Sequence, residues 1–182
     1  MNIRAQRRSD DDAVGRVLLD AFGRQRVVDL AAALLARADA PGVALVAEDE
    51  AAENEDDNTL IGHVQLSRSW IDAPDRLVEV LVLSPLGVAP HRQRQGVGRA
   101  LCAAALEGAQ RAGAPAVFLE GDPAYYARLG WEPASRYGVT PPSTRIPERG
   151  LQMTPLPGWR PDMAGALVYN DTFWSHDCVG LR

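Results

Sequence analysis

Lysine is absent from this sequence of 182 residues, so all 19 basic side chains are arginine. A Walker-type phosphate loop ends in Gly-Lys-Ser or Gly-Lys-Thr, because its lysine reaches the outer phosphates of the nucleotide. That class of nucleotide site is therefore excluded. The chain also cannot regulate itself through acylated lysine side chains, because the only amine it offers is the terminal one.

Cysteine and long apolar runs are also scarce. Two cysteines, Cys102 and Cys178, in a chain long enough to bury a sizeable core predict free thiols rather than disulfides. No histidine cluster accompanies them, so we expect no metal site. No run of 18 apolar residues and no signal-peptide core is present, which predicts a cytoplasmic protein without a membrane partner. We expect Cys102 to be buried in a helix and Cys178 to be exposed.

Positive charge is outnumbered, with 24 acidic residues against 19 basic ones and a net charge of −5. This balance argues against nucleic acid as a partner. Seven of the acidic residues lie between Glu48 and Asn58, where no large apolar side chain occurs. The composition favours a solvated or locally disordered loop. The alternative is a segment that attracts a cationic amine or repels anions.

A length of 182 residues without an internal repeat or a domain linker predicts a single domain over 1–182, with a core at about 1–156 and a C-terminal extension at 157–182 that packs on it. Ser9 is the expected N-cap of the first helix, followed by three aspartates that suit the helix dipole. Asp122 is the expected N-cap of a short helix that has Pro123 at its first position. Strands are expected at 3–6, 43–47, 59–70, 77–88, 116–120, from 131, and at 151–153 and 166–169; further helices at 27–38, 98–112 and 124–129; and loop in the rest of the proline-rich tail.

The most informative stretch runs from Pro90 to Arg99, between the strand that ends at Val88 and the helix that follows. The first N–H groups of a helix have no intrahelical acceptor and carry the positive end of its dipole. Glycines allow an anion to approach such a backbone closely, and Gly96 and Gly98 occur here together with three arginines. The stretch therefore predicts an anion site.

The spacing of the glycines narrows the kind of anion. A dinucleotide fingerprint needs a third glycine where this chain has Leu101. The remaining pattern, Gln93-x-x-Gly96-x-Gly98 after Leu86-Gly-Val88-x-Pro90, resembles the acyl-CoA loop of the GNAT N-acetyltransferase superfamily. A second segment, Gly-Asp-Pro-Ala-Tyr-Tyr-Ala-Arg-Leu-Gly-Trp-Glu-Pro at 121–133, is similar to one found in the YhbS-like branch of that superfamily.

The resemblance implies an α/β (α+β) fold, with a mixed six- to seven-stranded sheet splayed at the acyl-CoA site and flanked by about four helices. It implies an enzyme, an acetyl-CoA-dependent N-acetyltransferase, in which a primary amine of a small molecule or protein attacks the thioester directly. One alternative is a catalytically weak sensor or partner-binding module that binds acyl-CoA on the same fold. Another is a binder of nucleotide phosphates that uses the same loop.

The resemblance also implies roles for particular residues. The pantetheine arm of CoA is expected along Leu86, Gly87 and Val88, where a backbone N–H can stabilise the oxyanion. The pyrophosphate is expected on Gln93, Arg94, Gln95, Gly96, Val97, Gly98 and Arg99. Tyr126 matches the family's general acid, and the ordinary pKa of a phenol, about 10, lies close to that of a thiol, about 8.5.

The base that takes a proton from the amine is left open. Val82 occupies the strand position where some family members have a glutamate, and Glu79 lies nearby but on the other face of the strand. Other candidates are His91, Glu120, Asp122 and a water relay.

The acceptor amine is also not identified by the sequence. Its pocket is expected from the first two helices, the turn at 70–75 and the C-terminal segment. Trp159 and Trp174 are candidates either for a wall of that pocket or for a homodimer contact. His63 is expected to be partly exposed.

Overall fold

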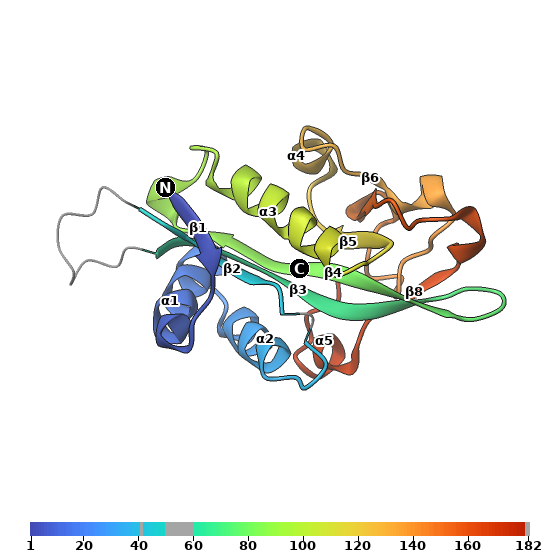
Figure 1. The fold of residues 1–182 in the computed structure, drawn as a ribbon. Coiled ribbons are helices and arrows are strands. Elements are labelled where there is room, and N and C mark those ends of the chain that lie inside the picture. Colours follow the sequence, from blue (N-terminus) through green and yellow to red (C-terminus); the bar gives the residue numbers. More distant parts are fainter. Residues whose placement is uncertain (41, 50–59, 181–182) are drawn as a thin grey trace. The chain divides into compact units, whose positions relative to one another are not determined.

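The computed structural model describes residues 1–40, 42–49 and 60–180, which form two compact units. The first unit contains Met1–Leu66 and Ser84–Gly108, and the second contains Ser67–Leu83 and the chain from Ala109 onward. Two long strands, β3 (Leu60–Asp72) and β4 (Leu77–Val88), contribute residues to both units (Figure 1).

The strands follow the order β1-β2-β3-β4-β5-β7-β6, and β8 pairs with β3. The β4–β5 pair is parallel, whereas the pairs β1–β2, β2–β3, β3–β8, β5–β7 and β6–β7 are antiparallel. The predicted mixed α/β class is confirmed. Within the described residues the sheet has eight strands rather than six or seven, because short strands at its margin join it.

In the first unit, a helix layer covers each face of the strands (Figure 1). Gln65 of β3 faces α2, since its Nε2 donates to the carbonyl of Ala31, 3.3 Å away. Gly62, three positions earlier on β3, faces the opposite way, toward α3. A Cβ on Gly62 would lie 2.8 Å from Leu101 Cδ1. The elements of this unit besides β3 and β4 are β1 (Asn2–Ala5), the 3-10 helix η1 (Arg8–Asp10), α1 (Asp11–Phe22), α2 (Gln25–Leu35), β2 (Ala44–Glu48), the 3-10 helix η2 (Pro90–Arg92) and α3 (Val97–Arg111), which begins here.

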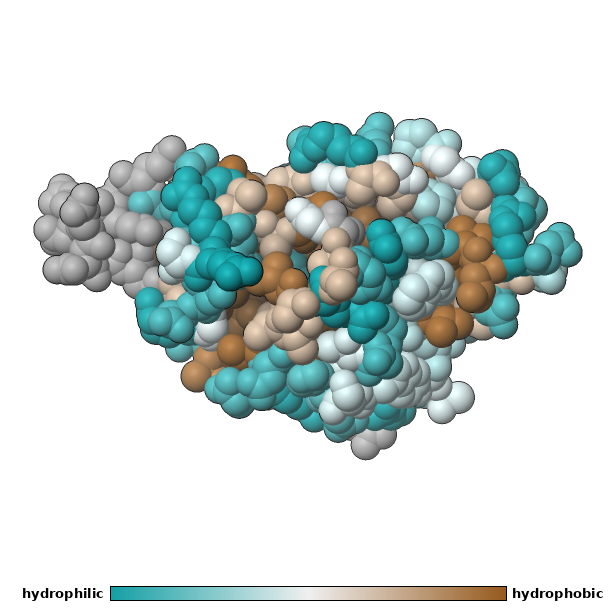
Figure 2. Space-filling model, turned by 60° about the horizontal axis from the view of Figure 1, so that its bottom comes forward, coloured by the Kyte–Doolittle hydropathy of each residue, from teal (hydrophilic) through white to brown (hydrophobic). Residues whose placement is uncertain are grey.

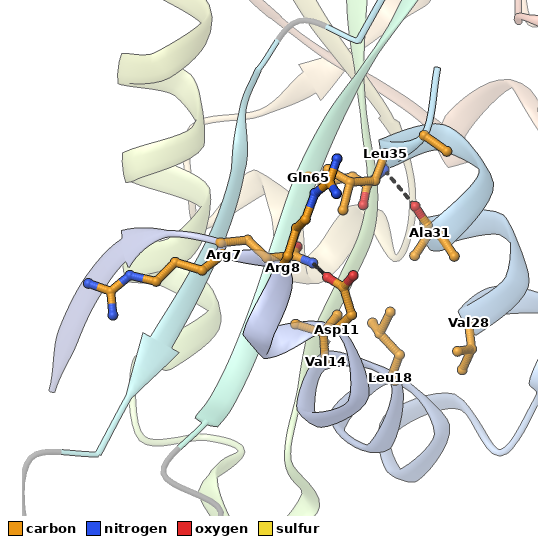
Figure 3. A pocket seen from close by; sticks show the side chains of 13 residues that line it. Arg7, Arg8, Asp11, Val14, Leu18, Val28, Ala31, Leu35 and Gln65 are labelled. Carbon is orange, nitrogen blue, oxygen red and sulfur yellow. Dashed lines mark hydrogen bonds between the residues drawn. The ribbon is translucent and has the colours of Figure 1, made fainter. Parts of the chain in front are cut away.

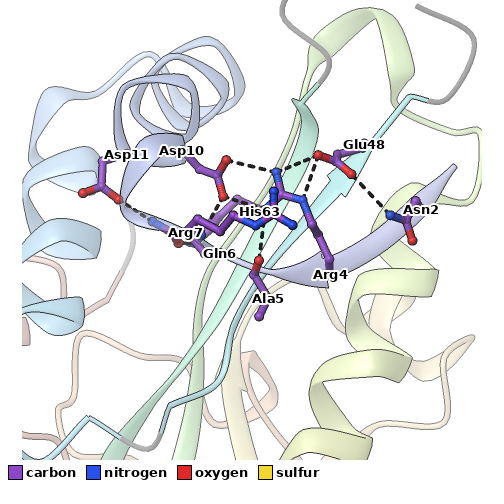
Figure 4. Close-up of polar contacts among 9 residues, drawn as sticks. All are labelled: Asn2, Arg4, Ala5, Gln6, Arg7, Asp10, Asp11, Glu48 and His63. Atoms are coloured by element: carbon purple, nitrogen blue, oxygen red, sulfur yellow. Dashed lines mark hydrogen bonds and ion pairs between the residues drawn. The ribbon is translucent and has the colours of Figure 1, made fainter.

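The start of α1 corrects the prediction that Ser9 is its N-cap. A 3-10 turn precedes the helix, the residue at the N-cap position is Asp10, and no side chain caps the helix. The Asp10 carboxylate instead pairs with Arg4, at 2.7 Å, and accepts from the Arg7 amide (Figure 4). Arg4 also bonds Glu48 at 2.6 Å, so one guanidinium joins the end of β2 to the start of α1. A partly buried ion pair is found in place of the expected cap.

In the second unit, large apolar side chains pack between short elements. Phe118, Trp131, Met153 and Phe173 are each at most 2% exposed. The elements of this unit, besides the remainders of β3, β4 and α3, are β5 (Ala116–Glu120), α4 (Pro123–Ala127), β6 (Glu132–Pro133), η3 (Ala134–Tyr137), η4 (Glu148–Gly150), β7 (Leu151–Pro155), η5 (Pro161–Met163), β8 (Ala166–Val168) and α5 (Asp171–Ser175).

Three predictions for the tail and for α2 are wrong. The tail contains the helix α5, which is capped by Asn170 through the Thr172 amide and held by the buried Phe173. Cys178 is only 5% exposed, although the sequence predicts an exposed side chain. The chain folds back after α5, and the Cys178 amide donates to the carbonyl of Phe173. Helix α2 ends at Leu35, before the predicted 38, and a turn follows.

The acidic stretch is described only at its start. Glu48 is the last residue of β2, and Asp49 forms an ion pair with Arg92. Residues 50–58, on which the prediction of a solvated loop falls, lie outside the described residues.

Large apolar side chains on the surface are few in the part of the chain that the structure describes. On the face drawn in Figure 2 the apolar residues form separate patches within hydrophilic surroundings. Among the described helices, none is both long and apolar enough to cross a bilayer. The exposed large apolar residues are Met1, Leu19, Leu35, Leu77, Val168 and Trp174.

Candidate functional site

The segment Gln93–Arg99, here called the anion loop, joins the 3-10 turn after β4 to helix α3. Its two glutamines hold it to the backbone that precedes it. Gln93 Nε2 donates to the carbonyl of Val88 at 3.1 Å, and Gln95 Nε2 donates to the carbonyl of His91 at 3.0 Å. One N–H of each side-chain amide therefore helps to fix the course of the loop backbone.

The backbone of the anion loop turns through the left-handed region twice. Arg94 has φ of 60° and Gly96 has φ of 90°. A side chain at Gly96 would meet no atom within 4 Å but would be strained by its backbone conformation. The helix starts at the next residue, so the amides of Val97, Gly98 and Arg99 have no acceptor within α3. A turn of this kind before a helix exposes several N–H groups to one anion.

The three arginines near the anion loop do not share one environment. Arg92 is engaged by Asp49. Arg94 and Arg99 are exposed, and their side chains form no hydrogen bond or ion pair with the described part of the chain. These two guanidinium groups are therefore available to an anion bound at the start of α3.

The end of β4 is packed from one side by α1. A Cβ on Gly87 would lie 2.8 Å from Leu18 Cδ2 and 3.6 Å from Phe22 Cε2, so a side chain at this position would force Leu18 of the helix to shift. The parallel ladder with β5 comprises Leu81↔Val117 and Val82↔Phe118, although β4 continues to Val88. Pro85 lies in that continuation and has no N–H to offer to a ladder.

In the second unit, the segment from Gly121 to Trp131 positions Tyr126. Asp122 caps α4 as predicted, because its Oδ1 accepts from the Ala124 amide at 2.9 Å. The Tyr126 ring lies edge-on to Tyr125 at 5.0 Å and to Trp131 at 6.0 Å between centroids. A Cβ on Gly121 would lie 2.2 Å from Tyr126 Cε2, so the missing side chain of Gly121 makes room for this ring.

The candidate bases differ in their surroundings. The side chain of Glu79 is 54% exposed and its carboxylate pairs with Arg68 Nε at 3.0 Å. Glu120 accepts from the Gly180 amide at 3.0 Å. One carboxylate oxygen of Asp122 caps helix α4 by accepting from the Ala124 amide. None of these contacts singles out one carboxylate as a base, and the assignment stays open.

Two further titratable groups are buried. His63 is 0% exposed rather than partly exposed as predicted, because it faces the helix layer on the same side of β3 as Gln65. Burial lowers the pKa of His63 to about 3, and its Nε2 lies 3.0 Å from Gln6 Oε1. Cys102 is buried as predicted, and burial raises the pKa of its thiol to about 12, which disfavours a nucleophilic thiolate.

Comparison with known proteins decides the family. A model of the acetyltransferase (GNAT) domain matches residues 2–134. The chain belongs to the GNAT acetyltransferases. A GNAT relative described as the uncharacterized N-acetyltransferase YjhQ of Escherichia coli (strain K12) is 31% identical over 142 residues, which is 78% of this chain and 75% of the relative.

Two solved GNAT structures resemble nearly the whole chain. Escherichia coli YhbS in complex with CoA has a TM-score of 0.80 at 25% identity and covers 94% of this chain and 91% of its own. A GNAT acetyltransferase of Brucella melitensis in complex with acetyl-CoA has a TM-score of 0.71 at 26% identity and covers 94% and 97%. This GNAT protein is thus an N-acetyltransferase, an enzyme that takes acetyl-CoA as its cosubstrate.

The polar contacts that sequence reasoning missed lie on the α1 and α2 side of the first unit. Gln65 and His63 alternate with Gly62 and Val64 along β3, and this period-2 pattern of polar side chains was a signal that they share one face.

Among the described residues no group of three or more His, Cys, Asp or Glu could hold a metal ion.

Proposed function

We propose that this GNAT acetyltransferase moves an acetyl group from acetyl-CoA to a primary amine by direct attack, with the anion loop as the pyrophosphate site. The start of α3 at Val97, directly behind the left-handed Arg94 and Gly96, is the observation that carries the proposal, because the first amides of a helix have no intrahelical acceptor. They form an anion cradle at the position that the family motif assigns to CoA. The CoA and acetyl-CoA complexes of the two structural relatives support this reading.

In the proposed reaction, the neutral amine nitrogen attacks the thioester carbonyl carbon and forms a tetrahedral oxyanion. Backbone N–H groups along Leu86, Gly87 and Val88 bind the pantetheine arm and stabilise that oxyanion. When the C–S bond breaks, the Tyr126 hydroxyl gives its proton to the departing CoA sulfur. The amine proton leaves to water or to a carboxylate such as Glu79. Tyr126 is assigned by its motif and supported by the packing that orients its ring.

The test compares Tyr126→Phe with Tyr125→Phe. Release of CoA thiol is followed with acetyl-CoA and a panel of primary amines, and CoA affinity is measured by calorimetry. We expect Tyr126→Phe to lower kcat by about 100-fold or more with unchanged CoA affinity, since a positioned general acid contributes roughly 10²–10⁴ in rate. Tyr125→Phe should keep most of the activity. Equal kcat values for Tyr126→Phe and the unsubstituted enzyme would remove Tyr126 from the mechanism.

A second variant tests the cradle and separates catalysis from binding alone. Gly96→Glu places a strained backbone and a negative charge beside the cradle, so we expect its affinity for CoA to fall at least tenfold. An enzyme that binds CoA through this loop but turns over no amine of the panel would instead be the acyl-CoA sensor considered above. We expect the active acetyltransferase to lie in the cytoplasm and to act on a cationic acceptor, which a net charge of −5 favours.

A further inference from the structure

A cavity of about 550 Å³ lies in the first unit between α1, α2 and β3 (Figure 3). Its volume is in the range of small-molecule sites, roughly 300–1,000 Å³. No residue of Leu86–Val88 or of the anion loop lines it. This cavity, here called the α1–α2 pocket, is therefore separate from the residues assigned to CoA.

The walls of the α1–α2 pocket are apolar. Val14 and Leu18 of α1 face Val28 and Leu35 of α2 across it. Leu35 is 39% exposed at the rim of the pocket. Small residues of both helices, Gly15 among them, leave the space between these side chains open. An apolar body entering the pocket would cover the exposed part of Leu35.

One end of the α1–α2 pocket is polar and carries an available cation. Arg8 lines the pocket, and its side chain forms no hydrogen bond or ion pair with the described part of the chain. Figure 3 shows this side chain directed across the pocket toward Gln65, whereas the neighbouring Arg7 extends away from it. Gln65 is 2% exposed and fixed by the carbonyl of Ala31, so it offers a polar group at a set position.

The acidic groups nearby do not neutralise Arg8. The Asp10 carboxylate is taken by Arg4 and by the Arg7 amide. Asp11, which also lines the pocket, accepts from Gln6 Nε2 at 2.9 Å (Figures 3 and 4). Arg7 extends away from the pocket, so Arg8 is the cation directed into it, and the Asp11 carboxylate already accepts from Gln6. The polar end thus favours an anionic head group, and a planar guanidinium suits a carboxylate in particular.

We propose that the α1–α2 pocket binds a small carboxylate with an apolar body, at a place separate from the residues assigned to acetyl-CoA. Its carboxylate pairs with Arg8 beside Gln65, and its apolar body packs between Val14 and Leu18 on one side and Val28 and Leu35 on the other. Binding displaces water from the apolar walls and gives Arg8 a partner.

The probe is octanoate, titrated into the full chain by calorimetry with CoA present at saturation. Octanol and octylamine carry the same apolar body with a neutral and a cationic head, and they serve as matched ligands. We expect octanoate to bind at least tenfold more tightly than either. Equal binding of the three, no binding of octanoate, or displacement of CoA by octanoate would overturn the proposal.

Two neighbouring arginines give a matched pair of variants. Arg8→Gln removes the cation at the polar end and should weaken octanoate binding about tenfold while leaving octanol unchanged. Arg7→Gln removes the same charge from a side chain that extends away and should retain octanoate binding. An equal loss of octanoate affinity in both variants would mean that only the overall positive charge of the region matters. That outcome would contradict a specific contact between the carboxylate and Arg8.

A third variant tests the apolar body of the pocket. Ala32 lines the pocket from an exposed position of α2, so Ala32→Phe should fill the cavity without disturbing the core. Octanoate and octanol should then both lose binding, with the melting temperature of the free protein unchanged. Retained octanoate affinity in a folded Ala32→Phe protein would place the ligand elsewhere and defeat the proposal.

Discussion

At the scale of single residues, missing side chains and buried polar groups set the local geometry. Gly121 is required because Tyr126 occupies the space that a Cβ would take. His63 is enclosed in the first unit with one hydrogen bond through Nε2, and its Nδ1 has no partner in the described residues. These two residues lead to separate predictions, one on turnover and one on stability.

Gly121→Ala should displace the Tyr126 ring, because the two atoms cannot remain 2.2 Å apart. If Tyr126 is the general acid, kcat falls by about tenfold or more while CoA affinity is unchanged, since misplacing a reacting group is costly. Thiol release and calorimetry measure the two quantities. Gly158→Ala is the control, because its Cβ would meet Pro115 only at 3.5 Å. Normal turnover in Gly121→Ala would separate the ring's position from catalysis.

His63 should make the protein sensitive to mild acid. Burial lowers its pKa from 6.5 to about 3, so the unfolded chain binds a proton between these values that the folded chain does not. The contribution of neutral His63 to the free energy of unfolding is therefore full above pH 6.5 and is lost as the pH falls toward 3. When the pH is lowered from 7 to 5.5, the free energy of unfolding measured in urea should fall by about 1 kcal/mol less in His63→Gln than in the unsubstituted protein. Parallel pH profiles would contradict this account.

At the scale of elements, the first unit depends on close contact between strands and helices. Gly62 lets α3 approach β3, and Gly87 lets α1 approach β4. Because α3 carries the anion loop at its N-terminus, the fit of Gly62 under Leu101 and Val97 also fixes where the cradle begins. The Arg4 ion pairs with Asp10 and Glu48 join β1, β2 and α1 on the other side of the strands. Arg4 holds the pKa of both carboxyl groups below their usual range.

Alanine at two glycines should have opposite effects on stability. Gly62→Ala places a Cβ 2.8 Å from Leu101 Cδ1 and 3.0 Å from Val97 Cγ1, and overpacking of this kind costs about 1–3 kcal/mol. Gly15→Ala in α1 meets Val28 Cγ1 at an ordinary 3.5 Å, so helix propensity should stabilise the protein by up to about 1 kcal/mol. Urea midpoints measure both. A stabilised Gly62→Ala protein would show that α3 is not held by this contact.

At the scale of the whole molecule, a net charge of −5 surrounds a local cationic site. Arg94 and Arg99 are exposed, so their attraction to phosphate groups is open to screening by salt. The acidic remainder of the chain opposes the approach of the same anion, and salt screens this repulsion also. The charges nearest to the bound phosphate groups have the larger effect. Arg94 and Arg99 lie in the anion loop itself, so their attraction is expected to exceed the repulsion by the acidic residues elsewhere.

The affinity for acetyl-CoA should therefore fall as salt rises, since the nearby arginines outweigh the distant acidic groups. Between 50 and 500 mM NaCl we expect about a tenfold increase in Kd by calorimetry. Acetyl-pantetheine, which lacks the nucleotide phosphates, is the matched ligand and should show little change. In the double variant Arg94→Gln, Arg99→Gln the salt dependence should flatten. A rise in affinity with salt would assign the dominant field to the acidic surface.

The sequence by itself determined the features that rest on local chemistry. The bounds of β4, the cap at Asp122 and the glycine pattern of the anion loop follow from residues close together in the chain, because turns, caps and helix starts are set by their own neighbours. The tertiary structure alone decided which side chains are enclosed. Burial of His63 depends on its place beside Gln6, 57 positions away along the chain. The pairing of Asp10 with Arg4, the burial of Cys178 and the space between α1 and α2 depend on how neighbouring segments fold against one another. The alternation along β3 places His63 and Gln65 on one face, but only the packing of the helices decides that this face is enclosed.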